Sequence, residues 1–194
     1  MNIVVVFANP KPQCFTRDVC NLFCEEATRR GHTVVLRDLY AMNFNPVASA
    51  EDIVGNLKGA VAPDVRVEQE LLDRADVVAF IHPIWWVDRP AILKGYVDRV
   101  FALGYAYGYS ANKERGGLQG KRAILITSAG SPDSHFHESG KMEAIRIAQD
   151  VGTMEFCGME MLGHVHFGPV GRRSSQAMID GYHQKIRDFV RDKL

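Results

Sequence analysis

The 194-residue chain has no excess of charge of either sign, because 23 lysines and arginines balance 23 aspartates and glutamates. A neutral chain lacks the basic surface that nucleic-acid and membrane-surface proteins use. No apolar run approaches the roughly 18 residues of a transmembrane helix, and residues 1–7 lack the basic flank of a signal peptide. These absences favour a cytoplasmic globular protein, which we expect to form one domain over residues 1–194.

Several ligand-binding motifs are also missing. The four cysteines, Cys14, Cys20, Cys24 and Cys157, form no CxxC pair and no zinc-type spacing with histidine, so we expect free thiols and no metal site. The chain contains neither GxGxxG nor GxxxxGK[ST], which excludes a Rossmann dinucleotide loop and a P-loop.

Apolar runs alternate with amphipathic stretches along the whole chain. Continuous β-branched or apolar runs predict buried strands at 3–8, 33–36, 77–81, 123–127 and 159–167. Helical periodicity predicts helices at 15–30, 64–75, 90–101, 141–156 and 174–194. Residues 39–63 show only a possible helical turn near 51–57. Five β/α units predict a doubly wound α/β fold, and five strands favour the flavodoxin-like order 2-1-3-4-5 over the classic dinucleotide-binding order.

Ligands of such sheets bind at the carboxyl ends of the strands, which points to three loops, 9–14, 82–88 and 128–137. The first loop leads into a helix whose free backbone N–H groups would suit an anion, with the Thr16 hydroxyl beside them. An ordinary strand–helix turn with Thr16 as a capping residue explains the same pattern equally well. The first loop alone therefore leaves both interpretations open.

The second loop holds both tryptophans of the chain, Trp85 and Trp86, between Pro83 and Pro90. Flat side chains with few rotamers suit the walls of a slot for a planar ring. The alternative is a hydrophobic plug over the end of the sheet.

The third loop is rich in small and hydroxyl residues and then carries His135 and His137. Imidazole is the side chain best suited to proton transfer at physiological pH, but with Glu138 these two histidines form only a weak metal-ligand set. A separate aromatic string, 105–109, indicates a cavity wall, a dimer contact or a hairpin packed on its own domain.

At this point the residues resemble the NAD(P)H:quinone oxidoreductase family, the DT-diaphorase-like flavoproteins, and especially its short bacterial branch. Several motifs carry the resemblance in the family's order, and they cover nearly the whole chain. They are the segments 38–46 (DLYAMNFNP), 83–86 (PIWW), 89–95 (RPAILKG), 98–101 (DRVF), 106–109 (AYGY), 127–130 (TSAG) and 156–158 (FCG).

The resemblance implies a homodimer with one flavin per chain, FAD or alternatively FMN, and with NAD(P)H as co-substrate. Carried over by position, the cofactor-binding residues are Asn9, Cys14, Phe15, Thr16, Gln69, Pro83, Ile84, Trp85, Trp86, Thr127, Ser128, Ala129 and Gly130. Substrate contacts fall on Trp86 and on three residues contributed by the partner chain, namely Tyr107, Tyr109 and Phe156.

The chain departs from the family pattern at several of these positions. Asn9, Cys14 and Thr16 stand where the family has histidine, serine and asparagine. His135 replaces a tyrosine that stabilises charge on the reduced flavin, and the family's later histidine has no clear counterpart. We therefore assign that role to His135, with His137 in reserve.

The resemblance implies ping-pong hydride transfer from NAD(P)H to a quinone through one shared aromatic slot. A flavodoxin-type electron carrier would share the fold, but such carriers are typically acidic, whereas this chain is neutral. A nitro- or azo-compound reductase would differ only in its acceptor. The non-enzymatic alternative is a regulatory, ancillary flavoprotein associated peripherally with a membrane efflux transporter.

Overall fold

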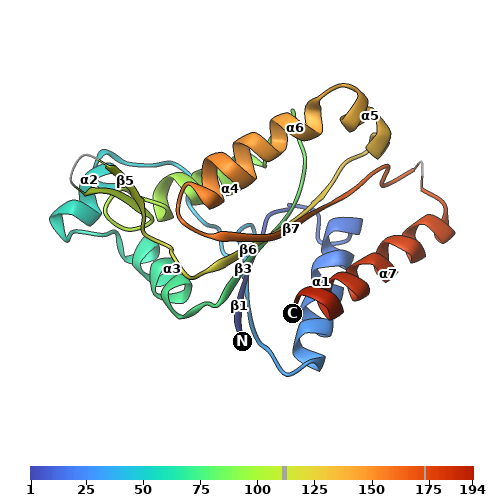
Figure 1. Cartoon of the computed structure of the whole chain (residues 1–194), viewed down its shortest axis with the longest axis horizontal. Coiled ribbons are helices and arrows are strands. Elements are labelled where there is room, and N and C mark those ends of the chain that lie inside the picture. Colours follow the sequence, from blue (N-terminus) through green and yellow to red (C-terminus); the bar gives the residue numbers. More distant parts are fainter. Residues whose placement is uncertain (111–112, 173) are drawn as a thin grey trace.

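The computed structural model describes residues 1–110, 113–172 and 174–194, and its centre is a five-stranded parallel sheet of order β2-β1-β3-β6-β7 (Figure 1). The strands are β1 (Asn2–Phe7), β2 (Thr33–Asp38), β3 (Val77–Pro83), β6 (Arg122–Ser128) and β7 (Glu160–Phe167). Counted along the predicted sheet, this is the order 2-1-3-4-5. The flavodoxin-like prediction is therefore confirmed.

Helices cover both faces of the sheet. They are α1 (Phe15–Arg29), α2 (Ala50–Lys58), α3 (Pro63–Arg74), α4 (Ala91–Val100), α5 (Asp133–Glu138), α6 (Lys141–Arg146) and α7 (Gln176–Lys193). Helices α1 and α7 lie side by side on one face, whereas α6 crosses the other face (Figure 1). Alternate strand residues consequently pack into two separate cores. One core groups Val5, Ile126 and Phe167 with α1 and α7, and the other groups Phe80 and Leu125 with α3 and α4.

Three local features differ from the sequence-based expectation, and a fourth matches one of the alternatives left open. The possible turn near 51–57 is a complete helix, α2, and the third loop contains the short helix α5. The helix predicted over 141–156 continues beyond α6 as a π-helical segment, η1 (Ile147–Glu155). The aromatic string enters an antiparallel hairpin of β4 (Tyr107–Ser110) and β5 (Lys113–Gly116), one of the alternatives left open. No helix in the described ranges is long and apolar enough to cross a membrane.

A buried arginine attaches α2 to the body of the fold. The Arg99 guanidinium donates to Asp52 Oδ2 at 3.0 Å, to Asp64 Oδ2 at 2.6 Å and to the carbonyl of Asn45 at 2.8 Å. Only 5% of the Arg99 side chain and 3% of the Asp52 side chain are exposed. The adjacent segment packs so closely on α4 that a Cβ at Gly95 would lie 2.1 Å from the carbonyl oxygen of Pro46.

Candidate functional site

The three predicted loops meet around one cavity of about 340 Å³, which we call the loop cavity. It lies at the carboxyl ends of β1, β3 and β6, where the strand order reverses, the position that ligands of this architecture occupy. Among its lining residues are predicted cofactor contacts from every loop: Asn9, Cys14, Phe15, Thr16, Pro83, Ile84, Trp85, Ser128, Ala129 and Gly130. The sequence reasoning therefore located a real concave site.

Three polar side chains join the floor of the loop cavity into one hydrogen-bonded set. The Asn9 amide Nδ2 donates to Thr16 Oγ1 at 3.2 Å, and Thr16 Oγ1 lies 3.0 Å from Ser128 Oγ. The Asn9 amide oxygen accepts from the backbone N–H of Lys11 at 3.0 Å, which fixes the first loop. All three side chains are buried. Because the set spans β1, α1 and β6, it holds the first and third loops in register.

The start of α1 supplies backbone donors to this cavity. Cys14 is the N-cap residue, and its side chain makes no capping hydrogen bond. The first N–H groups of a helix have no partner within the helix, so an uncapped start favours an anion in front of it. Cys14, Phe15 and Thr16 all line the cavity. This donor set is chemically suited to a phosphate group.

The two tryptophans lie in a tight turn with an unusual backbone. Trp85 and Asp88 exchange both backbone hydrogen bonds, at 2.9 and 3.0 Å, so Trp86 and Val87 occupy the centre of the turn. Their φ angles are 54° and 65°, in the left-handed region that costs a residue with a side chain about 1–2 kcal/mol. The Trp86 side chain is 99% exposed and that of Trp85 is 42% exposed. The turn therefore presents two aromatic rings outward instead of using them as a plug.

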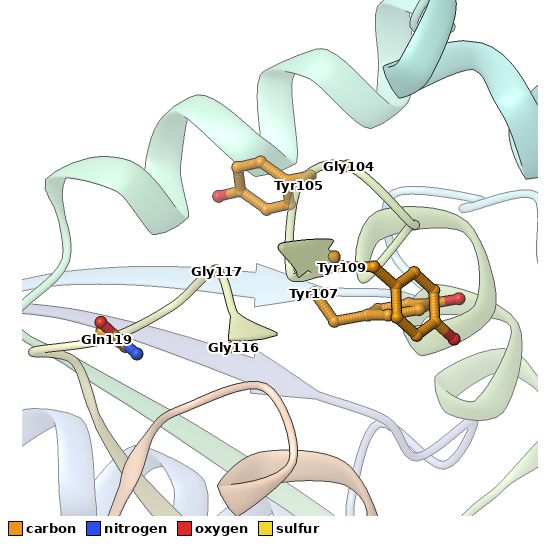
Figure 2. Close-up of a pocket in the computed structure, with 8 residues that line it drawn as sticks. Gly104, Tyr105, Tyr107, Tyr109, Gly116, Gly117 and Gln119 are labelled. Carbon is orange, nitrogen blue, oxygen red and sulfur yellow. The ribbon is translucent and has the colours of Figure 1, made fainter. Parts of the chain in front are cut away.

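The three residues predicted to contact substrate from the partner chain gather in a second place. Tyr107, Tyr109 and Phe156 line a groove of about 690 Å³ with Val97 and Phe101 of the α4 region, and we call it the aromatic groove. The Tyr107 and Phe156 rings lie 5.4 Å apart between centroids. Figure 2 shows Tyr107 and Tyr109 projecting from the hairpin, whereas Tyr105 lies towards α3.

Tyr105 is held by its own chain. Its hydroxyl donates to the carbonyl of Gln69 and contacts Asp73 Oδ1 at 3.0 Å. Tyr105 is therefore fixed to α3, whereas Tyr107 and Tyr109 line the aromatic groove. None of the four predicted substrate residues, Trp86, Tyr107, Tyr109 and Phe156, lines the loop cavity.

Five residues predicted to bind the cofactor or to stabilise its charge do not line the loop cavity. The Gln69 side chain is buried between α3 and α4, and its amide donates to the Val100 carbonyl at 3.1 Å. His135 and His137 lie exposed on α5, where His137 Nε2 is 3.6 Å from Asp133 and His135 Nε2 is 3.3 Å from Lys141 Nζ. Trp86 and Thr127 adjoin lining residues without lining the cavity themselves.

The structure adds lining residues that the sequence analysis missed. Lys11 and Gln13 come from the first loop, and Val170 and Gly171 come from the loop after β7. The carboxyl end of β7 lies at the same sheet edge as those of β3 and β6, so the topology alone could have identified this fourth loop.

A second missed feature is a row of buried polar side chains directly behind the cavity. His82, Thr127 and His166 are register partners on β3, β6 and β7, and each precedes the last residue of its strand. His82 donates from Nδ1 to the Pro83 carbonyl at 3.0 Å, and burial lowers the pKa of its imidazole to about 3. Burial likewise lowers the pKa of His166 to about 4. Both rings are therefore neutral near pH 7.

Comparison with known proteins gives relatives over essentially the full chain. An uncharacterized NAD(P)H oxidoreductase of Haemophilus influenzae is 31% identical over 193 residues, covering 96% of this chain and 95% of the relative. Human ribosyldihydronicotinamide dehydrogenase (quinone) is 29% identical, with 98% and 93% covered. The solved NAD(P)H:quinone oxidoreductase of Methanothermobacter marburgensis superimposes with a TM-score of 0.88 at 30% identity, covering 99% of this chain and 98% of that one.

The model of the flavodoxin-like fold family matches residues 1–190. This match agrees with the observed strand order and with a cavity at the point where that order reverses. The chain belongs to the flavodoxin-like fold family.

Proposed function

We propose that this protein is a flavin-dependent NAD(P)H:quinone oxidoreductase that reduces quinones or similar planar acceptors by two-electron transfer. The observation that carries the proposal is the loop cavity itself, which joins an uncapped helix start to an aromatic wall at the reversal point of the sheet. The names of the full-length relatives point to the same chemistry.

One set of residues would bind the phosphate of the cofactor, and a second set would bind its ring. The free N–H groups at the start of α1 and the Thr16 hydroxyl would bind the cofactor's phosphate. Pro83, Ile84 and Trp85 would bind the isoalloxazine ring, with residues 127–130 along its polar edge. We propose FAD, with FMN as the alternative, because the family resemblance favours the larger cofactor. Mass spectrometry of the released chromophore distinguishes the two.

A bound flavin would supply the hydride acceptor and donor chemistry, and the protein would supply orientation and electrostatics. Trp85 would form one wall of the cavity, and residues 127–130 would orient the polar edge of the ring. The buried imidazoles of His82 and His166, behind residues 127–130, are neutral and add no positive charge to the cavity at neutral pH. We propose that His135, or in its place His137, stabilises negative charge on the reduced flavin from the solvent-exposed side of the loop cavity.

The active unit would be a homodimer, in which one chain's loop cavity faces the other chain's aromatic groove. Within one chain, Tyr107, Tyr109 and Phe156 lie in a different hollow from Trp85. The ring of Trp86 is almost fully exposed, and Ile53, Tyr109 and Phe156 are also exposed apolar residues. A second copy that covered them would complete a slot for a planar substrate. Equilibrium sedimentation tests this assembly directly.

Steady-state kinetics test the proposed reaction. NAD(P)H and the quinone would use the same slot in turn, so initial-rate lines at several fixed quinone concentrations should be parallel in double-reciprocal form. Intersecting lines would contradict the shared slot. Absence of NAD(P)H oxidation by flavin-loaded protein with any quinone would contradict the proposed function as a whole.

A further inference from the structure

A continuous hydrogen-bonded chain of four side chains runs behind the third loop. His164 Nδ1 lies 2.8 Å from Asp150 Oδ1, and His164 Nε2 lies 2.9 Å from Thr127 Oγ1. The same hydroxyl lies 2.8 Å from Nδ1 of His166. We call this set, Asp150–His164–Thr127–His166, the imidazole relay.

The relay is largely shielded from solvent. The His164 side chain is 3% exposed and that of Asp150 is 13% exposed. Thr127 is 1% exposed, and His166 is 8% exposed with a buried Nε2 that has no partner among the described residues. Asp150 belongs to the π-helical segment, an irregularity that often marks functional sites. A proton that arrives at His166 Nε2 can therefore reach His164 Nε2 through the Thr127 hydroxyl, along hydrogen bonds alone.

The relay adjoins the loop cavity through the backbone. Thr127 immediately precedes Ser128, which lines the cavity and belongs to its hydroxyl floor. The neighbouring loop residue Ala129 donates its backbone N–H to the Phe167 carbonyl, next to His166, at 2.9 Å. The relay thus lies one residue behind the loop that would meet the polar edge of the cofactor.

The geometry defines two states that differ by one proton. When His164 is neutral, Nδ1–H donates to Asp150, the Thr127 hydroxyl donates to His164 Nε2 and accepts from His166 Nδ1–H. When His164 gains a proton, Nε2–H donates to Thr127 instead, and the Thr127 hydroxyl turns to donate to His166 Nδ1. The added proton enters at His166 Nε2, the His166 Nδ1 proton passes to the Thr127 hydroxyl, and the former Thr127 proton passes to His164 Nε2. No heavy atom has to move between the two states.

The charged surroundings favour His164 as the proton carrier. It is the relay imidazole with a hydrogen-bond partner at both ring nitrogens, one of them a carboxylate. His166 faces Asp133, His137 and Lys185 as well as His164, and burial keeps it neutral. His82 and Arg89 approach from the β3 side, and Arg89 also acts on Asp150. Because these groups include both signs, the Asp150 carboxylate in direct contact decides where the proton is held.

We propose that the imidazole relay takes up one proton from solvent, at His164, when a negative charge forms in the loop cavity. This inference rests on the proposed function, in which NAD(P)H delivers a hydride to the bound flavin. A hydride carries two electrons and one proton, so its transfer would consume no solvent proton and would leave one negative charge to be balanced in the loop cavity. The proton bound by His164 would balance that charge, and Asp150 would act as its positioning residue.

The direct test counts protons. Flavin-loaded protein is reduced anaerobically by one equivalent of NAD(P)H in weakly buffered solution that contains a pH-indicator dye. We expect uptake of one proton per flavin at neutral pH in the unchanged protein and almost none in Asp150→Asn. Thr127→Val, which removes only the shared hydroxyl, should also reduce the uptake. Asp180→Asn, an exposed carboxylate on α7, serves as the matched control and should leave the count unchanged.

Two measurements on every variant keep the outcomes distinct. Flavin content and unfolding temperature show whether the variant folds and binds its cofactor, and Thr127→Val replaces Asp150→Asn if the latter fails. Protein that binds no flavin would overturn the proposed function and the relay together. Protein that is reduced normally and takes up the same proton with Asp150→Asn and Thr127→Val would overturn the relay alone. Loss of proton uptake in His135→Asn, with normal uptake in Asp150→Asn, would also overturn the relay alone.

Discussion

The tryptophan turn provides a prediction in which stability and function change in opposite directions. Trp86 is 99% exposed at φ 54°, so its ring contributes little burial while its backbone is strained. Glycine removes a left-handed cost of about 1–2 kcal/mol and adds about 0.5–1 kcal/mol of unfolded-state entropy. Relative to Trp86→Ala, which keeps the Cβ, Trp86→Gly should therefore raise the free energy of unfolding by about 0.5–1 kcal/mol. For a chain of this size that is a rise of about 1–4 °C in unfolding temperature.

The assay is urea unfolding of flavin-free protein, with the two variants measured in parallel. Both variants lose the indole ring, so both should turn over the quinone more slowly, and to a similar extent. The comparison thereby separates backbone strain, which differs between the variants, from ring contact, which does not. Equal stability of Trp86→Gly and Trp86→Ala would refute the claim that this turn stores strain in order to present its aromatic ring.

Three further predictions concern the framework that holds the site. Gly95→Ala should destabilise the fold by about 1–3 kcal/mol, because its Cβ would overlap the Pro46 carbonyl oxygen. Gly181→Ala in α7, where the added Cβ meets nothing within 4 Å, should instead stabilise the fold by about 0.5–1 kcal/mol. Chemical denaturation of both variants measures the contrast, and equal effects would contradict the close packing at Gly95. Arg99→Met should lower the free energy of unfolding by about 3–5 kcal/mol, because it leaves the buried Asp52 carboxylate without its positive partner. Adding Asp52→Asn should restore part of this stability. No recovery in the double variant would show that the unpaired charge is not the cause. Burial holds the His82 pKa at about 3, below its unfolded value, so its stabilisation is complete above about pH 6.5 and declines as the pH falls towards 3. His82→Leu should flatten that part of the stability curve by up to about 1.4 kcal/mol per pH unit, and an unchanged slope in urea titrations would contradict the assignment.

The fold followed from the sequence because the signals were local and repeated. Continuous apolar runs marked all five parallel strands, and the strand count favoured the observed order. The elements that deviated were short or irregular. Helix α5 has six residues and α2 is held by Arg99 contacts distant in sequence, so periodicity in their own segments carried little information.

The candidate site was predictable as far as strand ends determine it. Knowing which loops follow β1, β3 and β6 was sufficient to bring Thr16, Trp85 and Ser128 to one cavity. Gln69, by contrast, uses its amide on a backbone carbonyl of α4, a tertiary contact that no local pattern encodes.

The imidazole relay is only partly predictable from the sequence. His164 and His166 alternate within a predicted strand, so they share a face of the sheet, and Thr127 is their neighbour on the adjacent strand. The partner Asp150 lies on a π-helical segment, whose register a regular helical pattern does not give. The complete chain of hydrogen bonds is therefore visible only in the structure.

The most direct test of the central claim is the flavin stoichiometry of the purified protein, followed by titration of flavin-free protein with FAD and with FMN. The account predicts a yellow protein that binds one flavin per chain, with quenching of tryptophan fluorescence that is reduced in Trp85→Ala and with weaker binding in Thr16→Val. Protein that binds neither flavin, or that binds one equally well in both variants, would contradict the assignment of the loop cavity.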